Sequence, residues 1–148
     1  MSTAAVTFAA SFAALYTAHE VGDHWVQTHR QALAKGAAGW SGRWACVRHV
    51  VALVVCKGIA LAALPLVVDL PLSLWAVVVA LAVDAISHYW ADRRSTLAAL
   101  AAKVGKGEFA RLGDGAVASV GTGAYALDQS WHIGWLCVAA LIIGGGAA

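Results

Sequence analysis

Four long apolar stretches constrain the fold of this chain more than any other feature of its sequence. They cover about residues 4–26, 44–68, 71–92 and 126–146. Each has the length of about 20 mostly apolar residues that an α-helix needs to cross the hydrocarbon core of a membrane. A composition that is 61% hydrophobic and 12% charged also departs from that of soluble domains. We expect an all-α integral membrane bundle of four transmembrane helices, forming one domain over residues 1–148.

The connections between these stretches differ in character. Pro65 and Pro71 stand on either side of a predicted tight turn between the second and third stretches. The other two connections, at about 27–43 and 93–125, are polar. The later of them contains an apolar repeat at helical spacing, made of Leu97, Leu100, Ala101 and Val104. This repeat, which follows a Ser95/Thr96 cap, predicts a short amphipathic helix on the membrane surface between the third and fourth spans.

The distribution of basic residues predicts the orientation in the membrane. Nine of the ten Lys and Arg residues lie in or beside the two polar connections, and the terminal tails contain none. Cytoplasmic loops are enriched in Lys and Arg, so we expect both polar connections in the cytoplasm and both termini outside. The tenth, Lys57, lies within the second span, where we expect it to pair with a carboxylate. A net charge of +2 without a basic run predicts no nucleic-acid partner.

Polar residues that are rare in membranes gather at the cytoplasmic ends of the predicted spans. Three stripes have a spacing of four residues: His19, Asp23 and Gln27; Asp84, His88 and Asp92; and Asp128 and His132. Residues four apart lie on one face of a helix, and in an antiparallel bundle these stripes share one side of the membrane. His49, near the start of the second span, belongs to the same side.

Imidazole and carboxylate groups in mixed sets are typical ligands of Zn, Fe and Mn. Several carboxylates buried in an apolar bundle are also costly without a cation. We therefore predict a site for one or two divalent transition-metal ions. Its expected ligands are His19, Asp23, His88, Asp92, Asp128 and His132. The alternatives are a metal-free polar network, a proton path and a bound organic cation.

The segments "HEVGDHWVQT", "DAISHYWAD" and "LDQSWH" together resemble a family of small bacterial and phage integral membrane proteins of unknown function, with motifs close to HxxxDxxxQ, HxxxD and DQxxH. More loosely, the stripes are similar to predicted membrane-bound metal-dependent hydrolases. The resemblance implies a bacterial cytoplasmic membrane location. It also implies that the residues that matter are His19, Asp23, Gln27, His88, Asp92, Asp128, Gln129 and His132.

A first hypothesis for the function is a metal-dependent hydrolase at the cytoplasmic membrane face. The metal would activate a water molecule, Glu20 or Asp84 would act as a general base, and His24 or His49 would act as an acid. A lipid-linked or amphiphilic phosphoester is the expected substrate class. Arg93, Arg94 and Lys35 could hold its anionic group, although positive-inside anchoring explains these residues more simply.

Two other classes of function stay open on the sequence. A metal or proton transporter or sensor could use Lys57 and Asp84 to extend a polar path away from the metal site. Four helices are few for a transporter, so this hypothesis requires a homo-oligomer. A non-catalytic membrane subunit could use the metal site only to hold its helices together. In each case membrane lipids surround the chain.

Overall fold

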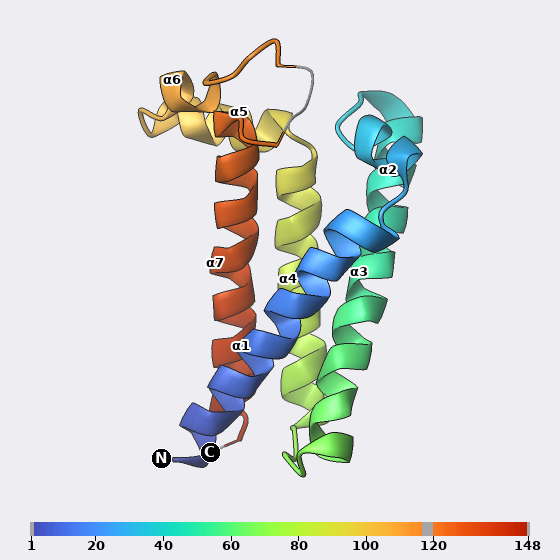
Figure 1. The fold of residues 1–148 in the computed structure, drawn as a ribbon, viewed down its shortest axis with the longest axis vertical. Coiled ribbons are helices and arrows are strands. Elements are labelled where there is room, and N and C mark those ends of the chain that lie inside the picture. Colours follow the sequence, from blue (N-terminus) through green and yellow to red (C-terminus); the bar gives the residue numbers. More distant parts are fainter. Residues whose placement is uncertain (1, 117–119, 148) are drawn as a thin grey trace.

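The computed structural model describes residues 2–116 and 120–147, and every regular element in them is helical. The elements are α1 (Thr3–Val21), the π-helical turn η1 (Gly22–Val26), α2 (His29–Ala34), α3 (Gly39–Val67), α4 (Leu74–Asp92), α5 (Ser95–Lys103), α6 (Gly107–Ala110) and α7 (Gly123–Gly145). Figure 1 shows the long helices α1, α3, α4 and α7 side by side, with the short helices at one end and both termini at the other. The all-α prediction is confirmed. Residues 1, 117–119 and 148 of the expected single domain lie outside the described residues.

Among the described residues, three helices are long and apolar enough to cross a membrane, namely α3, α4 and α7. The fourth long helix, α1, is not one of them. Its 19 residues are mostly Ala, Thr and Ser, with few large apolar side chains. It nevertheless runs along the bundle and packs against α7 and α3 (Figure 1).

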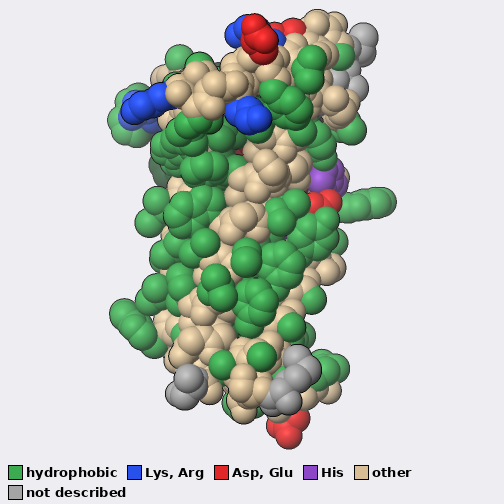
Figure 2. Space-filling view, turned by 90° about the vertical axis from the view of Figure 1, so that its left-hand side faces the viewer, with side chains coloured by type: hydrophobic (Ala, Val, Ile, Leu, Met, Phe, Trp, Pro, Cys, Tyr) green, Lys and Arg blue, Asp and Glu red, His purple; other side chains and the backbone are tan. Residues whose placement is uncertain are grey.

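The outer surface of the bundle is apolar over the length of the long helices. On α3, Val51, Val55 and Ile59 recur every fourth residue, and each is more than half exposed. Figure 2 shows hydrophobic side chains over the middle of the molecule, whereas Lys and Arg side chains gather at the end that carries α5 and α6. This distribution is typical of helices that face lipid at mid-height and headgroups at one end.

The hydrophobic core lies in the half of the bundle away from the short helices. Leu15, Leu61, Leu136 and Ile143 form its centre and are at most 1% exposed. Small residues let the helices approach closely, as is usual where membrane helices pack. They are Ala80 on α4 and Ala139 and Ala140 on α7. The core therefore supports the polar residues that occupy the other half.

The connection between α3 and α4 differs from the predicted tight turn. Pro65 lies inside α3, which continues to Val67. A proline inside a helix removes one backbone hydrogen bond, and α3 nevertheless continues for two residues beyond it. The chain reverses over residues 68–73. There the Ser73 hydroxyl accepts a hydrogen bond from the Ala76 amide at 3.4 Å and caps α4.

The short helix expected between the third and fourth spans is α5, but its cap is not the predicted one. Arg94 is the N-cap residue and has a φ of 57°, an unfavourable conformation for a residue other than glycine. Ser95 and Thr96 lie inside the helix, where their hydroxyl groups donate to backbone carbonyls. Its residues Leu97 and Ala101 line a cavity beside the polar cluster.

Candidate metal centre

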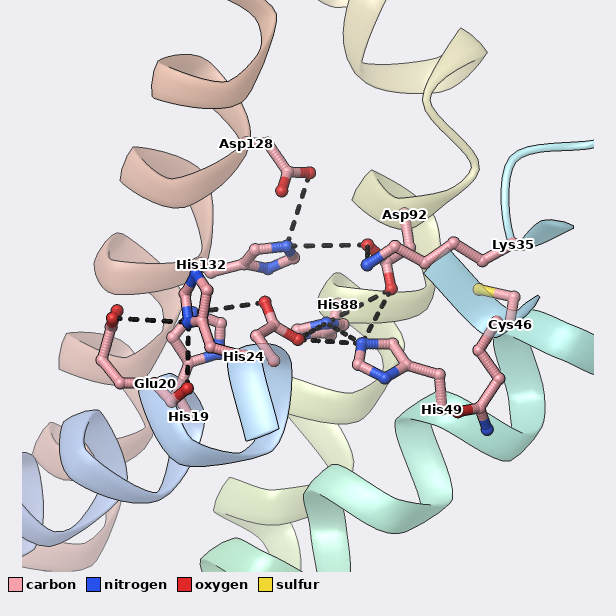
Figure 3. A network of polar contacts seen from close by, with 12 residues as sticks. His19, Glu20, His24, Lys35, Cys46, His49, His88, Asp92, Asp128 and His132 are labelled. Atoms are coloured by element: carbon pink, nitrogen blue, oxygen red, sulfur yellow. Dashed lines mark hydrogen bonds and ion pairs between the residues drawn. The ribbon is translucent and has the colours of Figure 1, made fainter. Parts of the chain in front are cut away.

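The four long helices bring the predicted stripes together in one buried cluster (Figure 3). We call this set the His/Asp cluster: His19 on α1, Asp23 on η1, His49 on α3, His88 and Asp92 on α4, and Asp128 and His132 on α7. Each of its imidazoles is at most 2% exposed. The cluster lies at the end of the bundle opposite both termini, next to α2 and α5 (Figure 1).

A close helix contact brings Asp23 to the centre of the cluster. Gly22 begins η1, and a Cβ atom there would lie 2.3 Å from a side-chain atom of Leu53 on α3. Any larger residue at this position would require the buried Leu53 side chain to move. The π-helical turn that follows is a feature often found at functional sites. It places Asp23 beside His49, which lies one turn from Leu53 on α3.

Four donor atoms lie close together around His49 and His88 at the centre of the cluster. His49 Nε2 lies 2.9 Å from Asp23 Oδ1, 3.4 Å from Asp92 Oδ2 and 3.3 Å from His88 Nε2. His88 Nε2 in turn lies 3.8 Å from Asp23 Oδ1 and 3.3 Å from Asp92 Oδ2. Donor atoms bound tetrahedrally at about 2.0–2.1 Å from one ion are about 3.3–3.4 Å apart. Five of the six distances among the four atoms are near this value, whereas Asp23 and Asp92 belong to separate groups with metal-ligand spacing.

The hydrogen bonding of these atoms supports the same interpretation. Asp23 Oδ1 and Asp92 Oδ2 are buried, and neither makes a hydrogen bond of normal geometry within the described structure. Both oxygens lie near Nε2 of His49, and this nitrogen lies 3.3 Å from Nε2 of His88. Buried carboxylate oxygens without partners are costly, and a cation among them removes that cost.

The remaining members of the cluster surround the central four. His132 Nε2 lies 3.5 Å from Asp128 Oδ1 and 3.9 Å from Asp92 Oδ1, and its ring stacks on that of His88 with 3.8 Å between centroids. His19 Nε2 lies 3.8 Å from an oxygen of Asp23. Within the described part of the chain, two groups have the spacing of metal ligands: Asp23, His49 and His88, and His88, Asp92 and His132.

A lysine from outside the four long helices reaches the cluster. The Lys35 ammonium lies 2.7 Å from Asp92 Oδ1, and the residue is 8% exposed. The Lys35 carbonyl accepts a hydrogen bond from Arg93 Nη1 at 2.5 Å, which holds the backbone of this residue against the end of α4. The sequence indicated a basic residue near the membrane surface, but no local pattern predicted this ion pair.

The two arginines after α4 hold the chain around α2. Arg93 Nη2 donates to the Ala37 carbonyl at 2.5 Å, and Arg94 Nη2 donates to the Ala32 carbonyl at 2.9 Å. Gly36 makes room for this contact, since a Cβ atom there would lie 2.7 Å from the side chain of Arg94. Both arginines thus bind protein backbone, and the segment from Ala32 to Ala37 is fixed beside the His/Asp cluster.

A cavity of about 390 Å³ opens next to the cluster. Asp23, Asp92 and Asp128 contribute carboxylates to its lining, and Leu97 and Ala101 of α5 contribute apolar surface. Lys35 lines it as well. The cavity therefore combines charged groups at the cluster with an apolar side, which suits an amphiphilic ligand.

His24 lines this cavity, and Glu20 lies beside His24; neither belongs to the four central donors (Figure 3). His24 Nδ1 donates to the Glu20 carbonyl at 2.9 Å and lies 3.6 Å from the Glu20 carboxylate. The other ring nitrogen, Nε2, lies 3.1 Å from the hydroxyl of Tyr125, which also lines the cavity. The sequence analysis did not include Tyr125, although its position one helical turn before Asp128 places it on the same side of α7.

Asp84 is already paired within the bundle. The Lys57 ammonium donates to Asp84 Oδ2 at 2.6 Å, and the two side chains are 0% and 3% exposed. The prediction that Lys57 pairs with a carboxylate is confirmed. The pair lies one helical turn from His88 along α4, and neither of its members belongs to the two groups with metal-ligand spacing.

The fold and site thus define a helical protein with three helices apolar enough to span a membrane and a buried His/Asp cluster at one end of them. A family model described as "Protein of unknown function (DUF3307)" matches residues 11–146, so the chain belongs to this family. Nothing in the comparisons supports the looser similarity to metal-dependent hydrolases. Neither the curated proteins nor the solved structures contain a match.

Proposed function

We propose that this protein is an integral protein of the bacterial cytoplasmic membrane that crosses it four times, with α1 as the fourth span. The packing of α1 against α7 and α3, as it crosses obliquely from one end of the bundle toward the other, supports this topology (Figure 1). Thr7 and Ser11, the polar side chains of α1 at mid-membrane depth, are fully buried in the bundle and not exposed to lipid. Basic residues at the end with the short helices favour a cytoplasmic location for that end, with both termini outside.

We further propose that the central four donors bind a divalent transition-metal ion, Zn, Fe or Mn. Asp23, His49, His88 and Asp92 would be its ligands. His49 belongs in this set more naturally than in the catalytic role considered from the sequence, because its Nε2 lies within 3.4 Å of each of the other three donor atoms. Asp128, His132 and His19 would then orient and neutralise the ligands around the ion.

The activity that fits this site best is metal-dependent hydrolysis of a lipid-linked or amphiphilic phosphoester. A bound divalent ion would supply Lewis-acid activation of a phosphoryl oxygen and of water. The observation that carries the proposal is the contact between the central donors and the cavity, because two of the four donors, Asp23 and Asp92, also line it. The apolar side of the cavity, on α5, would receive the hydrocarbon part of the substrate.

The groups at the cavity edge would handle protons. His24 is about two-fifths exposed at its side chain and lines the cavity, so it can exchange protons with both water and a bound ligand. Glu20 would position its ring, and Tyr125 would extend the hydrogen-bonded chain to α7. Asp84 remains a weaker candidate for a general base, since its carboxylate already accepts from Lys57.

A structural metal site is the second candidate, and one observation favours it. Two imidazoles and two carboxylates complete the four-coordinate shell that zinc adopts in structural sites. In that case the ion would join η1, α3 and α4 without taking part in a reaction. Iron and manganese accept further ligands beyond four, so the identity of the metal distinguishes the two candidates.

Metal content and hydrolysis in the purified protein test the proposal. Wild-type protein in detergent should contain about one equivalent of a transition metal and hydrolyse amphiphilic phosphoesters. His88→Ala should lose both properties. His29→Ala is the matched control, because His29 is exposed and outside the His/Asp cluster. A metal-free wild type would refute the proposal, and a metal-loaded wild type without hydrolysis would favour the structural alternative.

A further inference from the structure

The two oxygens of Asp92 face different parts of the His/Asp cluster. Oδ2 faces the nitrogens of His49 and His88, at 3.4 and 3.3 Å. Oδ1 faces His132 at 3.9 Å and the ammonium of Lys35 at 2.7 Å. A carboxylate that presents one oxygen to each of two cationic positions is the arrangement found between paired metal ions. The structure places a metal ligand set on one side of Asp92 and a lysine on the other.

The region around Asp92 Oδ1, which we call the second position, also contains potential metal ligands. His88, Asp92 and His132 form the other group with metal-ligand spacing. If His88 Nε2 binds an ion in the central set, His132 Nε2 remains between Asp92 Oδ1, at 3.9 Å, and Asp128 Oδ1, at 3.5 Å. Three such protein ligands are enough for a zinc ion that keeps an open coordination position.

The charges of the cluster favour one ion over two. With neutral imidazoles, the carboxylates of Asp23, Asp92 and Asp128 carry three negative charges, which one divalent ion and the Lys35 ammonium neutralise. Two divalent ions beside the Lys35 ammonium would leave two net positive charges in a place with little water, whereas without that ammonium one ion leaves one net negative charge and two ions leave one net positive charge. An excess of buried charge of one sign is strongly unfavourable.

We propose that the Lys35 ammonium takes the place of a second metal ion, so that the centre consists of one ion and one lysine. This inference rests on the proposed function. In hydrolases with two metal ions, the pair neutralises charge on both oxygens of a transferred phosphoryl group. Lys35 lines the same cavity as Asp92 and would contribute the second positive charge to the substrate phosphate. Without its ammonium, the second position can bind metal.

Zinc stoichiometry in detergent-purified protein tests the proposal directly. Apoprotein is titrated with Zn²⁺ alone, freed of excess ion, and assayed for bound zinc per chain. Wild type should hold about one ion. Lys35→Met, which keeps most of the aliphatic stem, should hold about two, and Lys35→Met combined with His132→Ala should return to about one. Lys103→Met is the matched control and should behave as wild type, because Lys103 is exposed.

Each outcome of this titration decides between the alternatives. Two ions in wild type, or one ion in Lys35→Met, would overturn the role of Lys35 and leave the metal centre standing. No zinc in wild type would remove the proposed function and this inference together. If Lys35→Met lacks a cooperative unfolding transition, Lys35→Gln replaces it, since an amide can still donate to Asp92, and the same two results apply.

Discussion

Removing the metal should destabilise the protein, and the amount follows from the carboxylates that it neutralises. Asp23 Oδ1 and Asp92 Oδ2 lie 2.9 and 3.4 Å from the same nitrogen of His49, so they are close to each other. At a separation of about 6 Å and an effective dielectric constant of about 20, two unit charges repel by about 3 kcal/mol. An ion at about 100 times its dissociation constant stabilises the folded state by about 2.7 kcal/mol. A chelator should therefore lower the free energy of unfolding of wild type by about 3 kcal/mol.

The Asp23→Asn variant distinguishes repulsion between the two carboxylates from a loss of hydrogen bonds as the cause of destabilisation. The variant should bind no metal and should not respond to chelator. It should also be more stable than chelated wild type, by up to about 3 kcal/mol, because a neutral amide does not repel Asp92. Asp92 itself is less suitable for the test, since its replacement would leave the buried ammonium of Lys35 without a counter-charge.

The assay is denaturant-induced unfolding in detergent micelles, with and without chelator. Asp69→Asn serves as the control, because Asp69 is exposed in the connection after α3, at the other end of the bundle. Its stability should respond to chelator as that of wild type does. If chelation leaves wild type unchanged, or if Asp23→Asn is no more stable than chelated wild type, the carboxylates are not neutralised by a metal.

Three further predictions concern the bundle. Lys57→Met should lower the free energy of unfolding by about 3–5 kcal/mol, because it leaves the Asp84 carboxylate buried and unpaired. Lys57→Met combined with Asp84→Leu should have a free energy of unfolding close to that of wild type. A metal content in this double variant that differs from wild type would show that the pair contributes to the metal site. Gly22→Val should cost about 1–3 kcal/mol and lower metal content, because its Cβ would meet α3; an unchanged metal affinity would contradict this. Cysteine probes should be labelled from outside at Ser2 but not at Gly107, and the reverse pattern would invert the topology.

The arrangement of the His/Asp cluster could be predicted because its information is local. His88 and Asp92, like Asp128 and His132, are four residues apart, and this spacing alone places them on one helix face. The apolar stretches then determine which ends of the helices meet. The sequence predicted the members of the cluster by this route, but it could not predict which four donor atoms converge, because that depends on how the helices rotate against each other.

The features that escaped prediction depend on contacts between distant segments. Lys35 reaches Asp92 only because two arginines after α4 bind the backbone near α2, and no spacing in the sequence encodes such a contact. Pro65 misled the prediction of the turn, because α3 continues through it to Val67. Similarly, α5 was expected on the membrane surface, but Leu97 and Ala101 line the cavity, a location that only the tertiary structure reveals.

X-ray absorption at the metal edge of the purified protein tests the central claim most directly, because it reports the ligands of the ion itself. The account predicts a shell of two imidazole nitrogens and two carboxylate oxygens at about 2.0–2.1 Å, as for zinc. In His88→Ala the spectrum should lose an imidazole contribution or the metal should be absent, whereas His29→Ala should reproduce the wild-type spectrum. A wild-type spectrum with water oxygens alone, or with no imidazole scattering, would contradict the assignment of Asp23, His49, His88 and Asp92 as ligands.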